Sequence, residues 1–228
     1  MSEEIKRIAI LGGTGDLGGG LARQWSRAGY EILIGSRTLE KGQQAAADLL
    51  AEFPDLHVTG LDNAAAAEQA DLVVLTVPFA HQLSTLDTVK HALVGKVLID
   101  VTVPLMPPKV GTVQLPEAGS AGQQAQDYLG EEVHVVSAFQ NVGAMHLQED
   151  HAIACDVLGT GNKRAARDTV ISLVEALGLR GWHAGPIANA AAAEALTSVL
   201  ITINRHHKIQ GSGLVITGEP AEDASTEG

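Results

Sequence analysis

Three glycines near the start of the chain have the spacing of a turn that holds a dinucleotide. The apolar run 8–11 is followed by Gly13, Gly15 and Gly18, which fit G-x-G-x-x-G between a strand and a helix. We assign Gly13 to the tight turn, Gly15 to close approach by a pyrophosphate and Gly18 to helix packing. The following helix directs free N–H groups and its positive dipole end at the phosphates. The alternative is a glycine turn without a ligand.

A serine and two cations follow the second predicted strand. Ser36, Arg37 and Lys41 occupy the stretch where NAD-binding proteins carry a carboxylate for the ribose, and where an arginine accommodates a 2′-phosphate. The guanidinium can form forked hydrogen bonds with phosphate, while the hydroxyl and the ammonium group add a donor and a charge. These residues predict that the chain binds NADP(H) in preference to NAD(H). The alternative is two solvated cations, although the first turn of a helix disfavours cations unless an anion is present.

Strand and helix patterns alternate along the first 140 residues. The buried-type run 72–75 is apolar throughout, which is typical of a parallel strand covered on both faces. The alternation predicts an α/β fold, with a Rossmann-like, doubly wound, mostly parallel sheet. The predicted strands are 7–11, 30–34, 57–59, 71–77, 96–101 and 132–137, and the predicted helices are 17–28, 39–52, 63–69, 82–93 and 120–129.

The second half of the chain predicts a small C-terminal helical part. We expect a strand near 152–158, a helix at about 162–177, a strand at 180–183 and a long helix from about 188 to 205. The long helix is rich in alanine and then apolar, which suits either a subunit interface or the core. We expect residues 1–218 to form a single domain and the acidic stretch 219–228 to be a disordered tail.

Composition excludes several classes of protein. A formal net charge of −12 over 228 residues argues against nucleic-acid and anionic-membrane partners. A lone cysteine, Cys155, excludes an internal disulfide framework, and its apolar surroundings favour a buried thiol over a nucleophile. The charged start of the chain does not resemble a signal peptide, and no apolar stretch has the length of a membrane span. We therefore expect a cytoplasmic protein.

The segments that follow the strands are the candidate walls of the site, because ligands of such sheets lie beyond the carboxyl ends of the strands. Residues 76–81, 100–104 and 138–144 combine small or apolar side chains with a few polar groups, as a flat aromatic ring requires. His81 either contacts the cofactor or bonds the backbone at a helix start. Asp100, at a strand end, either bonds a ligand or, as its position favours, has a capping or turn role. Residues 104–119 are either a mobile lid or partner contact, or a surface loop.

Nearly the whole chain apart from the tail resembles the NADPH-dependent reductases of coenzyme F420, an 8-hydroxy-5-deazaflavin. This resemblance implies a Rossmann-like domain with a small C-terminal part, usually homodimeric, that transfers a hydride between the nicotinamide and the deazaflavin. The matching segments are residues 10–18, 35–37 with Lys41, 75–81, 103–104, 137–144, 203–205 and 211–218.

The resemblance also implies where the cofactor lies. It assigns the pyrophosphate to Thr14, Gly15, Asp16 and Leu17, the 2′-phosphate to Ser36, Arg37 and Lys41, and the nicotinamide half to Val77, His81, Val103, Ala144 and Leu214. Direct hydride transfer between stacked rings requires placement and exclusion of water rather than a protein acid or base. We assign no catalytic residue and no metal ligand.

Two positions depart from the family's pattern. Asp16 stands where an asparagine is familiar, which puts a carboxylate near the phosphates and predicts weaker cofactor binding. Gln140 stands where a histidine is common, so a histidine contact to the deazaflavin is in doubt at this position.

Two other functions remain open from the residues. One is an NADPH-dependent reductase of another small acceptor, such as a carbonyl, an imine or a flavin-like molecule. That enzyme should carry a positioned lysine or histidine donor, and the sequence reveals none. The other is a non-enzymatic NADP(H)-sensing module, which would bind the cofactor without turnover.

Overall fold

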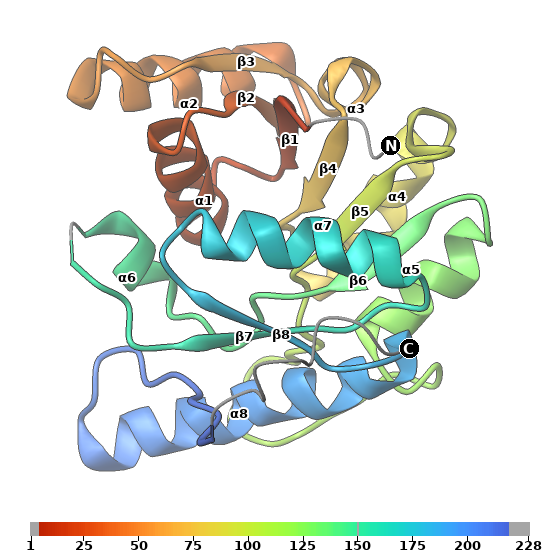
Figure 1. Ribbon diagram of the computed structural model, residues 1–228, viewed down its shortest axis with the longest axis vertical. Coiled ribbons are helices and arrows are strands. Elements are labelled where there is room, and N and C mark those ends of the chain that lie inside the picture. Colours follow the sequence, from red (N-terminus) through yellow and green to blue (C-terminus); the bar gives the residue numbers. More distant parts are fainter. Residues whose placement is uncertain (1–4, 150, 219–228) are drawn as a thin grey trace.

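The computed structural model describes residues 5–149 and 151–218, so the predicted disordered tail, residues 219–228, lies outside the described residues. Six parallel strands form the main sheet in the order β3-β2-β1-β4-β5-β6 (Figure 1). The order reverses beside β1, which confirms the predicted Rossmann-like, doubly wound architecture. The strands are β1 (Arg7–Leu11), β2 (Glu31–Ser36), β3 (Val58–Asp62), β4 (Leu72–Leu75), β5 (Val97–Asp100) and β6 (His134–Ser137).

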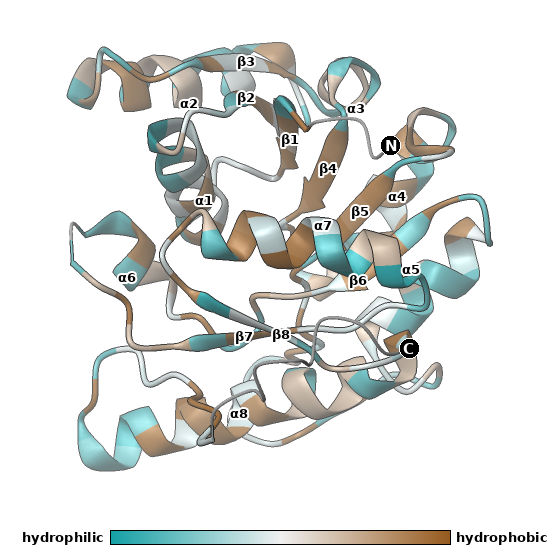
Figure 2. Cartoon of the chain, viewed as in Figure 1, coloured by the Kyte–Doolittle hydropathy of each residue, from teal (hydrophilic) through white to brown (hydrophobic). Residues whose placement is uncertain are grey.

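Helices cover both faces of the sheet and divide the core into two apolar clusters. Ile8 and Ile10 of β1 join the cluster under α1 (Asp16–Arg27), α2 (Leu39–Glu52) and α7 (Arg164–Glu175). Ala9 and Leu11 join the cluster under α3 (Asn63–Gln69), α4 (Gln82–Val89) and α5 (Ala121–Leu129). Because side chains alternate along a strand, a strand buried on both faces must be apolar throughout. Figure 2 shows β4 as a hydrophobic ribbon and most of β1 and β5 in the same hydrophobic colours.

The C-terminal part adds a second, smaller sheet beside β6. Strands β7 (Asp156–Gly159) and β8 (Arg180–His183) pair in parallel, and a single bridge between Ser137 and Thr160 connects them to the main sheet. Long helix α8 (Ala190–His207) lies along this end of the molecule (Figure 1). The short elements are α6 (Ala144–Gln148) and the 3-10 turns η1 (Phe79–His81), η2 (Lys90–Leu93) and η3 (Ile187–Asn189).

Several predicted boundaries differ from the structure. The strand expected at 152–158 begins only at Asp156, and the strand expected at 71–77 ends at Leu75. The helix expected over 82–93 divides into α4 and η2, and α6 was not predicted. Apolar residues continue past the ends of these strands, at Val77 after β4 and at Ile153 and Ala154 before β7, so the apolar pattern overestimates strand length.

One helical stretch corrects an expectation from the sequence. The stretch Ile187–His207 contains an 18-residue window with a mean hydropathy of 1.3 and is, by length and composition, apolar enough to cross a membrane, so the statement that no stretch reaches that length is wrong. The core helix of a soluble protein meets the same criteria. Ala190 and Ala193 of α8 are buried, and the buried Glu194 carboxylate accepts hydrogen bonds from α5. Packing against α5 therefore accounts for the apolar composition of one side of α8.

Candidate functional site

A cleft of about 570 Å³ opens at the carboxyl ends of β1, β2, β4 and β5. This edge is where doubly wound sheets bind their ligands. Ten of the twelve residues predicted to contact the cofactor line this one cleft. They are Thr14, Gly15, Asp16, Leu17, Ser36, Arg37, Lys41, Val77, His81 and Val103.

A larger hollow, of about 1050 Å³, lies at the opposite edge of the sheet. Its lining includes Lys6, Tyr30 and His57, at the amino-terminal ends of the strands, and Ser172 of α7. None of the residues predicted to bind the cofactor lines it. Parallel sheets direct helix N-termini and loop residues to the other edge, so we place the cofactor in the smaller cleft.

Two of the three motif glycines, Gly13 and Gly18, lie so close to neighbouring atoms that a side chain would not fit without a shift. A Cβ on Gly18 would lie 2.7 Å from Gly13 Cα and 2.7 Å from Thr76 Oγ1, which confirms its role in helix packing. The residue that gives the tight turn its left-handed conformation is Gly12, with φ +80°, and not Gly13 as the sequence suggested. Gly13 is required for space instead, because a Cβ there would lie 3.0 Å from Ile10 O.

Gly15 differs from the other two glycines of the motif. A Cβ there would meet only Gly12 O, at 3.7 Å, which is ordinary van der Waals contact. The residue is also the N-cap of α1 and provides no side-chain cap to the first turn. The first N–H groups of a helix have no intrahelical partner, so this end of α1 suits an anion.

The predicted 2′-phosphate residues lie together at the end of β2. Ser36 is the last residue of the strand and is buried, whereas Arg37 and Lys41 are exposed in the cleft. The Thr38 hydroxyl caps α2 by accepting a hydrogen bond from the Lys41 N–H at 3.4 Å. This cap fixes the first turn of α2, so both cations border the same end of the cleft.

Two walls enclose the other end of the cleft. One runs from Thr76 after β4 to His81, whose backbone N–H donates to Pro78 O at 2.8 Å. The other runs from Val101 after β5 to Leu105. Val77 and Pro78 on one wall and Val101, Val103 and Leu105 on the other are apolar, so this end suits an apolar ring. The His81 side chain is exposed here, and both sequence interpretations of it remain open.

Asp100 lies behind these walls and is completely buried. Its carboxylate accepts hydrogen bonds from the Thr102 N–H at 2.9 Å and from Gln82 Nε2 at 2.6 Å. The expected turn role is therefore confirmed. Burial raises the pKa of Asp100 to about 6, although both hydrogen bonds favour the ionised form.

Gln140 also occupies a structural position. Its Nε2 donates to Asp100 O and to Ser137 Oγ, each at 2.8 Å, and the residue is buried. The following Asn141 donates to Ala193 O of α8 at 2.8 Å. Hydrogen bonds thus hold the segment after β6 to β5 and α8. Gln140 is buried, whereas the His81 side chain is exposed in the cleft.

Ala144 and Leu214 do not line the cleft. Ala144 begins α6, where a Cβ on the preceding Gly143 would lie 3.1 Å from Gly211 Cα. The C-terminal segment that carries Leu214 runs beside this point, since the Asp156 N–H donates to Leu214 O at 2.7 Å. The start of α6 and the C-terminal segment therefore lie close to each other, outside the cleft lining.

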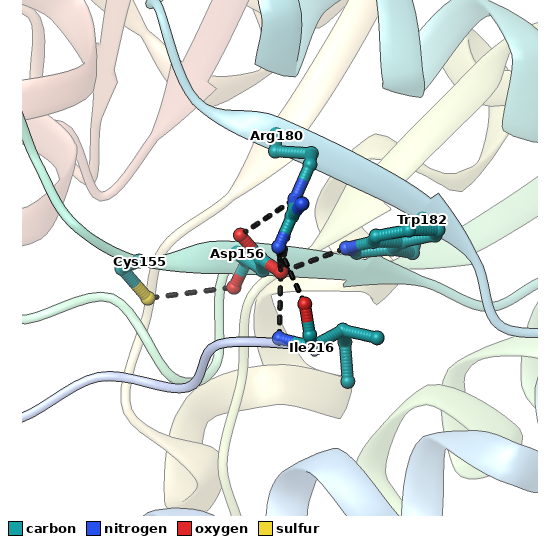
Figure 3. A network of polar contacts seen from close by, with 5 residues as sticks. All are labelled: Cys155, Asp156, Arg180, Trp182 and Ile216. Atoms are coloured by element: carbon teal, nitrogen blue, oxygen red, sulfur yellow. Dashed lines mark hydrogen bonds and ion pairs between the residues drawn. The ribbon is translucent and has the colours of Figure 1, made fainter. Parts of the chain in front are cut away.

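A network around Asp156 holds the C-terminal segment in place (Figure 3). The carboxylate pairs with Arg180 at 2.7 Å and accepts from Trp182 Nε1 at 2.8 Å and the Ile216 N–H at 2.7 Å. The Arg180 guanidinium holds the pKa of this carboxyl below its usual range. Burial raises the pKa of the neighbouring Cys155 thiol, which fits a structural thiol.

Helix α6 connects the C-terminal region to the glycine-rich turn. Gln148 Nε2 donates to Asp16 O at 2.7 Å, and a guanidinium nitrogen of Arg23 donates to Gln148 O. A Cβ on Gly20 would lie 2.6 Å from Leu147 Cβ. The run of glycines in α1 therefore serves close helix packing as well as the turn.

Sequence reasoning missed part of the cleft lining. The missed residues are Gly12, Asn63, Thr85 and Leu105. Four further lining residues, Thr76, Pro78, Val101 and Thr102, belong to the predicted wall segments 76–81 and 100–104, although they were not assigned as cofactor contacts. Asn63 follows the weakest predicted strand, and its Oδ1 is buried without a partner among the described residues. Across residues 5–149 and 151–218, no group of three or more His, Cys, Asp or Glu could hold a metal.

Known proteins share this fold and these segments. Residues 7–104 match the family described as "NADP oxidoreductase coenzyme F420-dependent". The F420-dependent NADP reductase of Methanothermobacter marburgensis is 41% identical over 94% of this chain and 99% of its own length. The enzyme of the same name from Methanocaldococcus jannaschii is 37% identical over 92% of this chain and 98% of its own length. A solved protein from Arthrobacter sp. FB24, provisionally named an F420-dependent NADP reductase, has a TM-score of 0.78 and 28% identity, covering 94% of this chain and 100% of its own.

Proposed function

We propose, because this chain belongs to the family of F420-dependent NADP reductases, that it transfers a hydride between NADP(H) and coenzyme F420. One observation carries the proposal: a single cleft gathers the glycine-rich turn, the three predicted 2′-phosphate residues and the apolar walls. The nicotinamide and the deazaflavin supply the redox chemistry when bound, and the chain supplies their placement.

The phosphate end of the cleft would bind NADP(H) through backbone and cations. We assign the pyrophosphate to Thr14, Gly15, Asp16 and Leu17 at the start of α1, where Gly15 leaves open space. Arg37 and Lys41 would hold the 2′-phosphate together with the Ser36 hydroxyl, since two exposed cations border this end in a protein of net charge −12.

The other end of the cleft would hold the nicotinamide. Val77, His81 and Val103 line it from two walls and would limit access of water to the ring. Ala144 and Leu214 lie outside the cleft, and we propose that they extend the site toward the second substrate. No proton-transfer step is assigned to a side chain.

We further propose that the protein is a homodimer, as the resemblance to its family implied. The outward side of α8 exposes Val199, and the neighbouring loop exposes Met106, Val113 and Leu115. Thr202 Oγ1 donates to Gly111 O at 2.9 Å, which joins loop and helix into one surface. A second copy would cover these apolar side chains. Light scattering should give the mass of a dimer, and Val199→Glu should shift it to a monomer.

The remaining expectations complete the proposal. We take residues 1–218 as a single functional domain, because β6 is bridged to the small sheet and Glu194 binds α8 to α5. We propose a cytoplasmic protein that acts on small molecules and binds neither nucleic acid nor membrane, consistent with its acidic charge.

One assay tests the proposed activity. Purified protein is mixed with NADPH and oxidised F420, and the visible absorbance of the deazaflavin is followed. Loss of absorbance at a rate proportional to enzyme concentration is expected. Tight NADPH binding without bleaching would reject the proposal; consumption of NADPH with a carbonyl, imine or flavin acceptor would then favour the alternative reductase, and binding without any turnover would favour a sensing module.

A further inference from the structure

The buried carboxylate of Asp100 connects the two walls of the nicotinamide end. Its first oxygen accepts from the Thr102 N–H at 2.9 Å, and Thr102 lies between two cleft-lining valines of one wall. Its second oxygen accepts from Gln82 Nε2 at 2.6 Å, and Gln82 directly follows His81 of the other wall. The Val101 N–H donates to Leu75 O at 3.2 Å where the two walls begin, and beyond that backbone bond the Asp100 side chain links the two segments.

The direction of the hydrogen bond from Gln82 is fixed by its other partners. Its Nε2 also donates to Ala121 O at 2.9 Å, and its Oε1 accepts from Gln124 Nε2 at 2.8 Å. A flipped amide would lose both of these bonds, so Gln82 must present a donor to Asp100. Both neighbours of the Asp100 side chain are therefore donors, and only a carboxylate accepts from both.

Helix α8 supports this arrangement from behind. The Glu194 carboxylate accepts from the Ala121 N–H at 2.6 Å and the Gly122 N–H at 2.9 Å, which fixes the N-terminus of α5. Ala121 is the residue whose carbonyl orients Gln82. Asp100, Gln82 and Glu194 are each at most 1% exposed, so water does not compete for these bonds.

We propose that Asp100 is a positioning residue for hydride transfer, which fixes the nicotinamide between the two walls through its bonds to Thr102 and Gln82. This inference rests on the proposed function for the identity of the ring. Transfer of a hydride depends steeply on the separation of donor and acceptor carbons, and a misplacement of about 1 Å can cost about 100-fold in rate. Asp100 touches neither reactant and acts only through the walls.

A swap of donor and acceptor tests the proposal. Asp100→Asn places an amide donor against Gln82 Nε2, and we expect the single-turnover hydride-transfer rate to fall about 10- to 100-fold. The dissociation constant for NADPH should change less than about threefold, because the phosphates bind at the other end of the cleft. The double variant Asp100→Asn with Gln82→Glu restores the donor–acceptor pair between these two side chains but gives up the bond from Gln82 Nε2 to Ala121 O, so it should recover part of the lost rate.

Two controls separate positioning from general destabilisation. Val170→Ala removes buried methyl groups from α7, which contributes no residue to the cleft lining, and should lower the melting temperature with an unchanged transfer rate. If Asp100→Asn does not fold, Gln82→Met, which removes the link to one wall, takes its place. A rate within twofold of the wild type, or a double variant that regains stability without regaining rate, overturns the proposal.

Failure of the proposed function would be distinguishable from failure of this inference. Wild-type protein that does not reduce F420 rejects the function alone. The nicotinamide fluorescence of bound NADPH then reports the geometry: Asp100→Asn should shift the emission toward that of free NADPH, and the double variant should reverse the shift. Identical emission from all three proteins overturns the positioning role.

Discussion

The two ends of the cleft are built in opposite ways. The phosphate end comes from one continuous stretch, β1 through the first turn of α2, and presents exposed cations and backbone N–H groups. Behind the proposed nicotinamide end lie Asp100, Gln82 and Glu194, which come from β5, α4 and α8 and are each at most 1% exposed. Exposed charges are screened by salt, whereas buried polar groups depend on complete hydrogen bonding.

This difference assigns separate tasks to the two ends. Binding affinity for NADP(H) should reside in the exposed phosphate end, and the rate of transfer should reside in the buried end. Substitutions at one end should then leave the property of the other end unchanged. Variants at each end test whether NADP(H) affinity and transfer rate change independently.

The largest expected effect is that of Arg37→Ala on NADPH affinity. Loss of a charge-assisted hydrogen bond costs about 1.5–3 kcal/mol, which corresponds to roughly 10- to 100-fold in the dissociation constant. NADH lacks the 2′-phosphate, so its affinity should change little. Fluorescence titration with both nucleotides measures this, and equal losses for NADPH and NADH would refute the 2′-phosphate role of Arg37.

Gly20→Ala should lower stability by about 1–3 kcal/mol, because its Cβ would lie 2.6 Å from Leu147 Cβ of α6. Gly19→Ala is the matched control, since its nearest contact would be 3.7 Å, and it should stabilise α1 by up to about 1 kcal/mol. Urea unfolding measures both. A large loss of NADPH affinity in folded Gly20→Ala protein would show that the phosphate end also depends on the distant α6.

Stability should decrease as pH rises through the range in which Glu194 titrates. Burial raises the pKa of Glu194 from 4.5 to about 8, so the folded protein retains a proton that the unfolded chain releases. The contribution of Glu194 to the free energy of unfolding is complete below pH 4.5 and is lost as the pH rises to about 8, by at most roughly 1.4 kcal/mol per pH unit. Burial raises the pKa of Asp100 from 3.8 to about 6, so its contribution to the free energy of unfolding is lost between about pH 4 and pH 6.

Glu194→Gln should therefore flatten the dependence of unfolding free energy on pH between pH 6 and pH 8. Asp156→Asn is the control: Arg180 lowers the pKa of Asp156 below its usual range, so that group titrates only in acid. It should lower stability without changing this slope. A slope in Glu194→Gln equal to that of the wild type would contradict the buried titration.

The same contrast explains how much could be predicted from the sequence. Gly18, Arg37 and Lys41 lie in one βαβ unit, where spacing alone determines which side chains meet. The mostly parallel, doubly wound class of the sheet followed from buried apolar strands that alternate with helices, whereas the strand order came only from the structure. Both kinds of information are local.

The Asp100–Gln82 contact could not be predicted, because nothing in the spacing of two polar residues shows that both are buried. Helix α6 has only five residues and depends on Gly20 of α1 to pack, so its own sequence carries little helical signal. The tight turn was assigned to Gly13 instead of Gly12, since adjacent glycines leave the residue with positive φ undetermined.

The smallest expected effect concerns the carboxylate of Asp16. It lines the cleft in the first turn of α1, where its charge opposes that of a pyrophosphate. Asp16→Asn should tighten NADPH binding about threefold at low salt, and the gain should disappear at high salt because the side chain is exposed. Glu40→Gln removes an exposed carboxylate from the first turn of α2, outside the cleft lining, and should leave affinity unchanged. A gain from Asp16→Asn that persists at high salt would place a buried interaction at the phosphate end and so break the contrast between the two ends.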